Sequence, residues 1–154
     1  MHDDVTLQRR RFLATAAVSA VGAAAWSVRT KAAQLSAAEQ ANVRLVDEFC
    51  AAWSAPIDMT RLRPFLADGC IYRPTETTPA QTGRDAIVES LGQFVGNATF
   101  CEFEVVETFA RGSIVVNERW DRFELPERKV EWHGVGVFYI VDGKIAEWSD
   151  FTIL

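Results

Sequence analysis

The chain has 154 residues and a formal net charge of −5 at pH 7, with only two histidines and three cysteines. The cysteines lack the spacing of metal ligands and one histidine is His2, so too few soft ligands remain for a zinc site. No repeat, low-complexity linker or second domain is visible, which leaves one folded unit after any N-terminal signal.

The first 33 residues have the character of an export signal. Residues 9–13 read R-R-R-F-L, the twin-arginine pattern, and an Ala-rich apolar run continues to Val28, with small residues near Ala33 for cleavage. The alternative is a membrane anchor, but the run is at the short end of a span of about 20 residues and contains serine and glycine. We predict a twin-arginine signal over residues 1–33 and a periplasmic or secreted domain over residues 34–154. The membrane is then contacted only through an uncleaved signal.

Removal of this signal takes away five Lys or Arg and two Asp or Glu, so the formal net charge becomes −8. Such an acidic domain lacks the excess of positive charge that binding to the phosphates of nucleic acid needs. The remaining 121 residues suit one hydrophobic core. Cys50, Cys70 and Cys101 lie among apolar neighbours and are predicted to be buried, with one disulfide as the alternative.

The first part of the domain is predicted to be helical. Ser36 and Glu39 form a capping box that starts a helix to about Trp53, with apolar residues at helical spacing. Asp58 caps a shorter second helix that is expected to end near Gly69, with a break or a tight first turn at Pro64.

From residue 70 the pattern alternates between strand and helix. We predict a short strand over 70–73, a Thr- and Pro-rich loop over 74–83, and a third helix over 84–95. Four long strands with alternating apolar and polar residues follow, at 99–110, 113–125, 130–141 and 144–154. This order predicts an α+β fold with a bent sheet wrapped around the N-terminal helices and a pocket between them.

One predicted strand carries charge on an otherwise apolar face. Side chains alternate along a strand, so Arg119 and Asp121 share a face with Val115, Phe123 and Leu125. A solvated face would not need the flanking apolar residues, and a plain core face would not carry the charged pair. The mixture indicates the wall of a pocket.

Hairpin register decides which other residues share that wall. A two-residue turn at 142–143 pairs Asp150 with Val135, and a three-residue loop at 126–128 pairs Asp121 with His133. One face then carries Arg119, Asp121, His133, Trp148 and Asp150. A loop of two or four residues would turn the first two away, unless a β-bulge restored them.

In this arrangement two carboxylates flank one guanidinium. Burial raises a carboxyl pKa, a nearby arginine lowers it, and a second carboxylate raises one member of the pair. One ionised and one protonated aspartate would supply a general base and a general acid at the same pH. A structural ion pair explains the same residues equally well.

An ordered set of short motifs accompanies these residues. They are Tyr72, Thr82-Gly83-Arg84-Asp85-Ala86, Glu118-Arg119-x-Asp121, Gly136-Val137-Phe138, Gly143-Lys144-Ile145 and Trp148-Ser149-Asp150. Together they resemble the limonene-1,2-epoxide hydrolase family, within the wider group of nuclear transport factor 2 and SnoaL-like polyketide cyclases. The resemblance covers nearly all of the domain after residue 33.

The resemblance implies a curved mixed sheet around a cone-shaped pocket, a homodimer, and hydration of a small apolar epoxide in one step without a cofactor. In this scheme Asp150 is the base that deprotonates water, and Asp121 is the acid that protonates the epoxide oxygen. Arg119 bridges the two carboxylates, and Tyr72 helps to hold the water.

On the predicted register the substrate is lined by Trp148, Phe123, Val135, Val137 and His133. Trp120 and Trp132 are placed on the opposite face, where they suit helix packing or a dimer contact.

One departure from the family pattern concerns the water. The family has Asn two residues after the tyrosine, whereas this chain has Pro74, with Thr75, Glu76 or His133 as possible replacements. Isomerase, dehydratase or cyclase chemistry on the same fold, and a non-catalytic periplasmic small-molecule-binding domain, are therefore the alternative functions.

Overall fold

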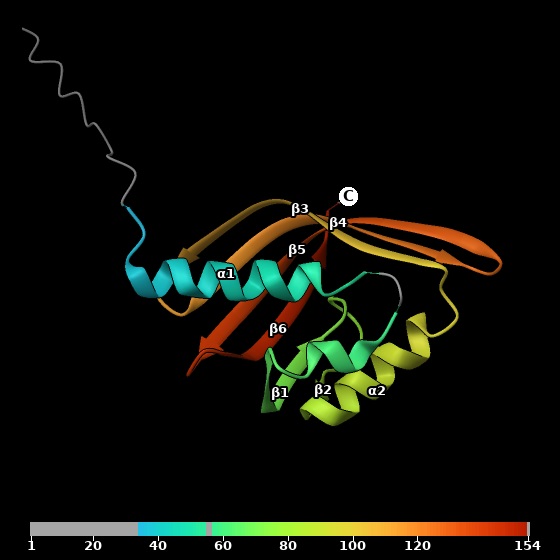
Figure 1. The fold of residues 1–154 in the computed structure, drawn as a ribbon, viewed down its shortest axis with the longest axis horizontal. Helices are drawn as coiled ribbons and strands as arrows, with labels where there is room; N and C mark the ends of the chain where they lie inside the picture. Colours follow the sequence, from blue (N-terminus) through green and yellow to red (C-terminus); the bar gives the residue numbers. More distant parts are fainter. Residues whose placement is uncertain (1–33, 55–56, 154) are drawn as a thin grey trace, which may run out of the picture. The chain divides into compact units, whose positions relative to one another are not determined.

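A computed structural model describes residues 34–54 and 57–153 (Figure 1). The elements in chain order are α1 (Ala37–Ala51), the 3₁₀ helix η1 (Met59–Leu62), β1 (Leu66–Arg73), β2 (Gln81–Thr82), α2 (Arg84–Val95), β3 (Phe100–Arg111), β4 (Ile114–Leu125), β5 (Arg128–Val141) and β6 (Lys144–Thr152). The signal predicted for residues 1–33 lies outside the described residues, so it stays a prediction. Within the described ranges no helix combines the length and the apolar character that a membrane crossing needs.

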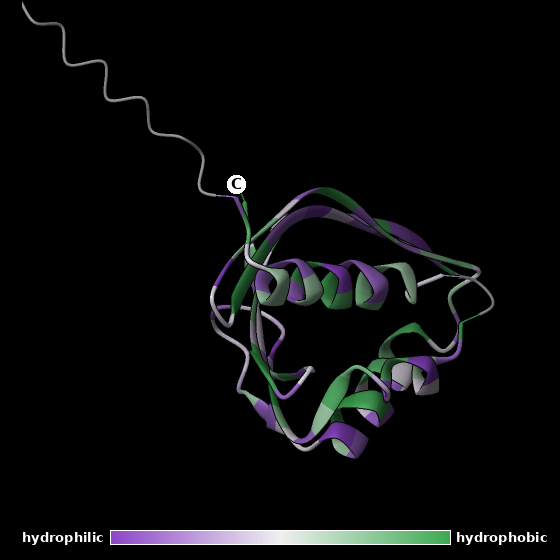
Figure 2. Cartoon of the chain, turned by 60° about the vertical axis from the view of Figure 1, so that its left-hand side comes forward, coloured by the Kyte–Doolittle hydropathy of each residue, from purple (hydrophilic) through white to green (hydrophobic). Residues whose placement is uncertain are grey.

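The strands form one mixed sheet in the order β2-β1-β6-β5-β4-β3. Only β1 and β6 run parallel, and every other neighbouring pair is antiparallel. The sheet curves around α1 and α2, as Figure 2 shows, and does not close on itself. The predicted α+β fold with a bent sheet around helices is therefore confirmed.

Helix α1 begins where the capping box predicts. The Ser36 N–H donates to Glu39 Oε2 at 2.8 Å, and the Glu39 N–H donates back to Ser36 Oγ at 3.2 Å. The second oxygen of Glu39 accepts from the Gly112 N–H at 2.8 Å. The start of α1 is thereby fixed to the turn between β3 and β4.

The second predicted helix is wrong in length. Asp58 caps it as expected, but only the single turn Met59–Leu62 forms. Pro64 lacks the N–H that a longer helix needs, and Leu66 already pairs with Ile145 of β6. The predicted loop over residues 74–83 also contains a short strand, β2, which pairs with β1.

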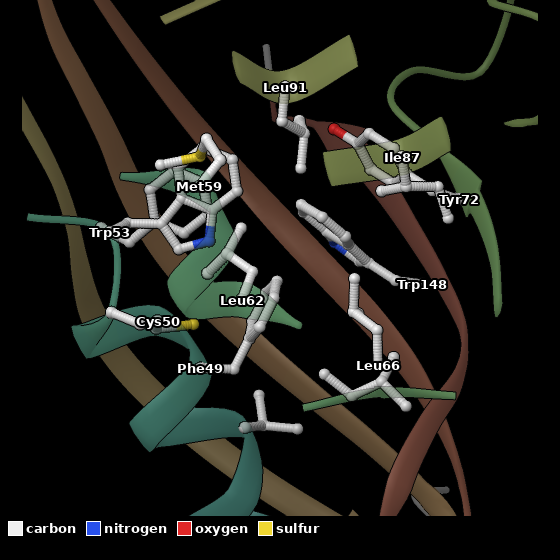
Figure 3. Packing of buried hydrophobic residues seen from close by; sticks show 14 of the residues in the cluster. Phe49, Cys50, Trp53, Met59, Leu62, Leu66, Tyr72, Ile87, Leu91 and Trp148 are labelled. Atoms are coloured by element: carbon white, nitrogen blue, oxygen red, sulfur yellow. The ribbon is translucent and has the colours of Figure 1, made fainter. Parts of the chain in front are cut away.

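Aromatic and aliphatic side chains pack together in the core between α1, η1 and the sheet (Figure 3). Phe49 of α1 meets Trp148 of β6 edge to face at 5.0 Å between ring centroids, and Trp148 also stacks on Phe138 of β5. Complete burial of each such ring is worth roughly 1.5–3 kcal/mol. The three cysteines are buried and free, as the favoured interpretation predicts.

The strand register differs from the prediction at two places, and the differences compensate. The β4–β5 turn has two residues rather than three, because Leu125 pairs with Arg128. The two-residue turn at 142–143 is confirmed, but a bulge then makes Tyr139 pair with Glu147, so Asp150 faces Gly136 rather than Val135. The alternation of β5 is inverted, yet β4 and β6 keep the predicted faces. Arg119, Asp121 and Asp150 therefore stand on one face.

Candidate active site

Arg119 on β4 lies at the centre of a buried ion network and is 1% exposed. Its Nε donates to Asp121 Oδ1 at 2.8 Å, and its Nη2 donates to Asp121 Oδ2 at 3.2 Å and to Asp150 Oδ1 at 2.6 Å. The remaining nitrogen, Nη1, donates to Asn117 Oδ1 at 2.9 Å. One guanidinium thus joins two carboxylates from different strands.

A glycine makes room for this guanidinium. A Cβ at Gly136 would stand 2.1 Å from Arg119 Nη1 and 2.8 Å from Asn117 Oδ1, so no larger residue fits without displacing them. On another side the guanidinium carbon lies 4.7 Å from the ring centroid of Phe103. The arginine is held by packing as well as by hydrogen bonds.

Asp150 on β6 has two further donors. The Trp148 indole N–H donates to Oδ1 at 2.7 Å, and the Tyr72 hydroxyl lies 3.5 Å from Oδ2. Tyr72 and Trp148 stand on neighbouring strands and stack at 3.9 Å between ring centroids. Figure 3 shows the two rings side by side, so one stack positions both donors.

Burial and charge act in opposite directions on the carboxyl groups. Burial raises the pKa of Asp121 to about 6, against the lowering effect of Arg119 and with a further rise from the charge of Asp150. Burial also raises the pKa of Asp150, and it is opposed by Arg119, Trp148 and Tyr72. Burial raises the pKa of Tyr72 well above its ordinary value, so this hydroxyl stays a donor.

A cavity of about 390 Å³ lies against this network. It is lined by Trp53, Tyr72, Pro74, Thr75, Thr78, Gln81, Ser90, Leu91, Phe94, Phe103, Arg119, Asp121, Phe123, Trp132, His133, Gly134, Val135, Asp150, Phe151 and Thr152. Phe94 and Trp132 stack on each other and are 40% and 42% exposed, so they form part of the rim. The cavity has apolar walls and one charged region.

Residues 46–148 match the family of SnoaL-like domains. The chain belongs to this family. Its fold is similar to that of an LEH-like epoxide hydrolase from M. tuberculosis, with a TM-score of 0.66 at 23% identity over 75% of this chain and 84% of the other. It is also similar to a protein described as a SnoaL-like polyketide cyclase from Shewanella putrefaciens CN-32, with a TM-score of 0.64 at 17% identity over 71% and 88% of the two chains. At these identities the likeness shows a shared fold.

The SnoaL-like domain brings together the four residues predicted to carry the chemistry. Arg119, Asp121, Asp150 and Tyr72 all line the cavity, although they come from β4, β6 and β1. Phe123 lines it too, as predicted. Their proximity agrees with the arrangement that the resemblance implies.

The side chains of three predicted lining residues are on the outer face of the sheet because the alternation of β5 is inverted, although His133 and Val135 still belong to the cavity lining. The side chain of His133 stacks on Trp120 at 4.3 Å on the opposite face of the sheet, and its Nε2 is 2.8 Å from Glu118 Oε1. The side chains of Val135 and Val137 share that outer face, and of these two residues only Val135 belongs to the cavity lining. Trp132, predicted for the outer face, lines the cavity instead.

Trp148 also has a different position from the predicted one. It is fully buried, lies outside the cavity lining, and holds Asp150 through its indole N–H. The sequence shows that Trp148 shares a strand face with Asp150, because the two residues are two positions apart. The spacing does not show how deeply the Trp148 side chain is buried.

Sequence reasoning missed the side of the cavity that β2 and α2 supply. Gln81 of β2 pairs with Tyr72, and Ser90, Leu91 and Phe94 of α2 lie over the same space. The helical spacing marks Leu91 and Phe94 as one apolar face of α2. No pattern in the sequence indicated that this face borders a cavity.

Pro74, which stands where the limonene-1,2-epoxide hydrolase pattern has asparagine, lines the cavity but has no N–H to offer. Of the predicted replacements, Glu76 accepts from the Thr152 N–H at 3.0 Å, and His133 points to the other face. Thr75 lines the cavity and lies 2.7 Å from Thr78 between hydroxyl oxygens.

Proposed function

We propose that this SnoaL-like protein hydrolyses a small apolar epoxide to a diol in one step, without a cofactor. The observation that carries the proposal is the single buried guanidinium of Arg119 between two cavity-lining carboxylates. The arrangement provides a base and an acid at one site, separated by a cation that stabilises whichever carboxylate is ionised.

In the proposed reaction Asp150 removes a proton from a water molecule while the water oxygen attacks one epoxide carbon. The carbon–oxygen bond of the ring breaks, and the leaving oxygen takes the proton of Asp121. The site ends with the proton on Asp150 and the charge on Asp121, and exchange with solvent resets it. The site gains one proton and gives one up, so its net charge does not change, and Arg119 contacts whichever carboxylate is ionised.

The hydrogen bonds support this division of roles. Three side chains donate towards Asp150, whereas Arg119 is the donor to Asp121. Donors favour the ionised form, and this supports Asp121 as the carboxyl group that holds the proton in the proposed reaction. Its Oδ2, at 3.2 Å from Nη2, is the more weakly held of the two oxygens, and we assign the transferable proton to it.

Two substitutions test the proposal. Asp150→Asn and Asp121→Asn keep the shape of each side chain but remove the base or the acid, and each is expected to lower kcat by about 10²- to 10⁴-fold. Diol formation from a panel of aromatic and terpenoid epoxides is the measurement, with thermal unfolding to confirm the fold. Asp142→Asn, in the exposed β5–β6 turn, is the matched control. Near-normal diol formation by both site variants would refute the assignment.

The competing reaction uses Asp150 as a base on a carbon acid, as in an isomerase, dehydratase or cyclase. The observation in its favour is Pro74 at the position of the water-holding asparagine. Turnover in ¹⁸O-labelled water separates the two, because hydrolysis must place one labelled oxygen in each diol. Product without label would favour the reaction in which Asp150 removes a proton from carbon. Tight ligand binding without any turnover would favour a non-catalytic binding protein.

A further inference from the structure

A row of three paired residues crosses the sheet next to the guanidinium of Arg119. Asn117 of β4 pairs with Gly136 of β5, and Gly136 pairs with Asp150 of β6. Directly paired residues project to the same face, so the side chains of Asn117 and Asp150 stand on either side of a position that has none. The guanidinium fills that position, since a Cβ at Gly136 would collide with Arg119 Nη1. It therefore contacts Asp150 at one end of the row and Asn117 at the other.

The amide of Asn117 is fully buried, and its two partners determine its orientation. A guanidinium has only donors, so the amide oxygen must face Arg119, and Oδ1 accepts from Nη1 at 2.9 Å. The amide nitrogen then faces the other way and donates to Cys50 Sγ of α1 at 3.1 Å. Asn117 does not belong to the cavity lining, so it acts on the reacting groups through Arg119.

Asn117 is the neutral member of the three side chains that accept hydrogen bonds from the guanidinium. The other two are Asp121 and Asp150, so the site holds one cation and two carboxyl groups. A buried cluster is most stable when its charges balance, and here a single proton achieves that balance. One carboxyl group then holds a proton while the other is ionised, which is the state that an acid and a base need. An aspartate at position 117 would bring a third carboxyl group, and balance would need a second proton.

The other titratable groups beside this network are neutral. Burial raises the pKa of the Cys50 thiol of α1 and of the Cys101 thiol of β3 to about 12. Burial also raises the pKa of the Tyr72 hydroxyl of β1 well above its ordinary value, and β5 contributes only a glycine at this point. Among the residues that the structure describes, the charge next to the guanidinium therefore comes from its two carboxyl partners alone.

We propose that Asn117 is a positioning residue, whose neutral amide holds Arg119 Nη1 and so leaves the guanidinium shared between two carboxyl groups and a single proton. The inference rests on the proposed function for its catalytic meaning. The position of the guanidinium and the protonation of Asp121 can nevertheless be measured without any turnover.

The first test adds a charge at this position. Asn117→Asp keeps the shape of the side chain and its acceptor, but the added charge repels the ionised forms of Asp121 and Asp150 and competes for Arg119. The pKa of Asp121 is expected to rise by at least about 1, and the pH profile of kcat/KM is expected to move upward with it. NMR titration of ¹³C-labelled carboxyl groups measures this pKa, with Asp121→Asn to assign the signal. Asn97→Asp, in the exposed turn after α2, is the matched control and leaves the pKa and the profile unchanged.

The second test removes the acceptor without adding a charge, and it remains available if Asn117→Asp does not fold. In wild type, Nη1 and Nη2 of Arg119 are expected to give separate ¹H–¹⁵N NMR signals, because their hydrogen bonds hinder rotation of the guanidinium. Asn117→Leu is expected to merge these signals and to lower kcat by about ten- to hundredfold. KM is expected to stay unchanged, because no contact with the substrate is lost.

Either of two results would overturn the inference. If Asp121 titrates at the same pH in Asn117→Asp as in wild type, position 117 does not set the charge of the site. If separate Nη1 and Nη2 signals persist in Asn117→Leu, Asn117 does not hold the guanidinium. Both measurements are made without substrate, so a raised pKa of Asp121 together with no hydrolysis of any epoxide would support this inference and contradict the proposed reaction.

Discussion

Arg119 is a buried charge whose surroundings satisfy nearly all of its donors. Burial alone would lower the pKa of its guanidinium, but Asp150 and Asp121 raise it further than burial lowers it, so the arginine stays charged. The loss of one carboxylate leaves the other in place, whereas the loss of the arginine would leave two buried carboxylates without a cation. Removal of one partner from such a network costs about 3–5 kcal/mol when a charge remains unpaired.

The raised pKa of Asp121 predicts the pH dependence of the reaction. A carboxyl group with a pKa of about 6 is protonated below that pH and ionised above it, so the acid is lost as the pH rises. We expect kcat/KM to fall by about tenfold for each pH unit well above this pKa. Initial rates between mildly acidic and alkaline pH give the profile, and a flat or rising profile over that range would contradict the role of Asp121 as the acid.

The contact between Gly136 and Arg119 predicts the effect of one added methyl group. Gly136→Ala displaces the guanidinium from both carboxylates, with an expected loss of about 10²-fold in kcat/KM and of about 1–3 kcal/mol in the free energy of unfolding. Enzyme assays and chemical denaturation measure the two effects. Gly69→Ala is the control, because a Cβ there meets nothing within 4 Å. Full activity in Gly136→Ala would show that the arginine does not need its present position.

At the scale of elements, the bulge in β6 decides which side chains reach the cavity. Ile145 and Trp148 are an odd and an even residue, yet both are buried in the core, because Ala146 is the extra residue between two pairs of the ladder. Regular alternation cannot place both on one face. Because the bulge shifts the pairing by one residue after the turn at 142–143, the side chain of Asp150 points towards the cavity.

Two single-residue deletions in β6 test this register. Deletion of Ala146 removes the bulge but leaves Ile145, Trp148 and Asp150 on the same face, so we expect the fold and activity to survive. Deletion of Ser149 moves Asp150 into the outward position, so activity is expected to fall to the level of Asp150→Asn. Tryptophan fluorescence reports the burial of Trp148 in both variants. Retention of activity after deletion of Ser149 would refute the assigned register.

At the scale of the molecule, the outer face of the sheet carries exposed apolar side chains. Phe109, Ile114, Tyr139 and Val141 are 52%, 49%, 48% and 41% exposed, and strand alternation places them opposite the cavity. Both described helices lie on the inner side of the curved sheet (Figure 2). Exposed apolar side chains on one sheet face are typical of an interface, and we propose a second copy of the chain as the partner, in line with the homodimer that the family resemblance implies.

The proposed homodimer predicts the effect of a charge on this face. Tyr139→Glu is expected to shift the protein from dimer to monomer in sedimentation experiments, since the same substitution enters a two-fold interface twice. Val106→Glu, an exposed apolar position outside this group, is the control. A monomeric wild type, or a dimer that withstands Tyr139→Glu, would contradict the proposal.

The sequence was sufficient for local structure and for the residues of the proposed chemistry. The capping box at Ser36, the helix over residues 84–95 and the turn at 142–143 depend on neighbouring residues, and the structure confirms each. Charged residues between apolar ones on β4 marked the wall of the cavity. Local backbone and side-chain chemistry determine these features, so the order of residues is enough to predict them.

The tertiary structure decided everything that depends on register or on distant contact. The inverted alternation of β5 puts the side chain of Trp132 on the cavity face and that of His133 on the opposite face, because a turn of two residues and a bulge both shift pairing by one. The short run after Pro64 became a strand only because β6 offers it a partner. Gln81 reaches the cavity for the same reason, through pairing with Tyr72. Such contacts form between segments far apart in the chain, and a one-residue shift reverses them, so no local pattern could have determined them.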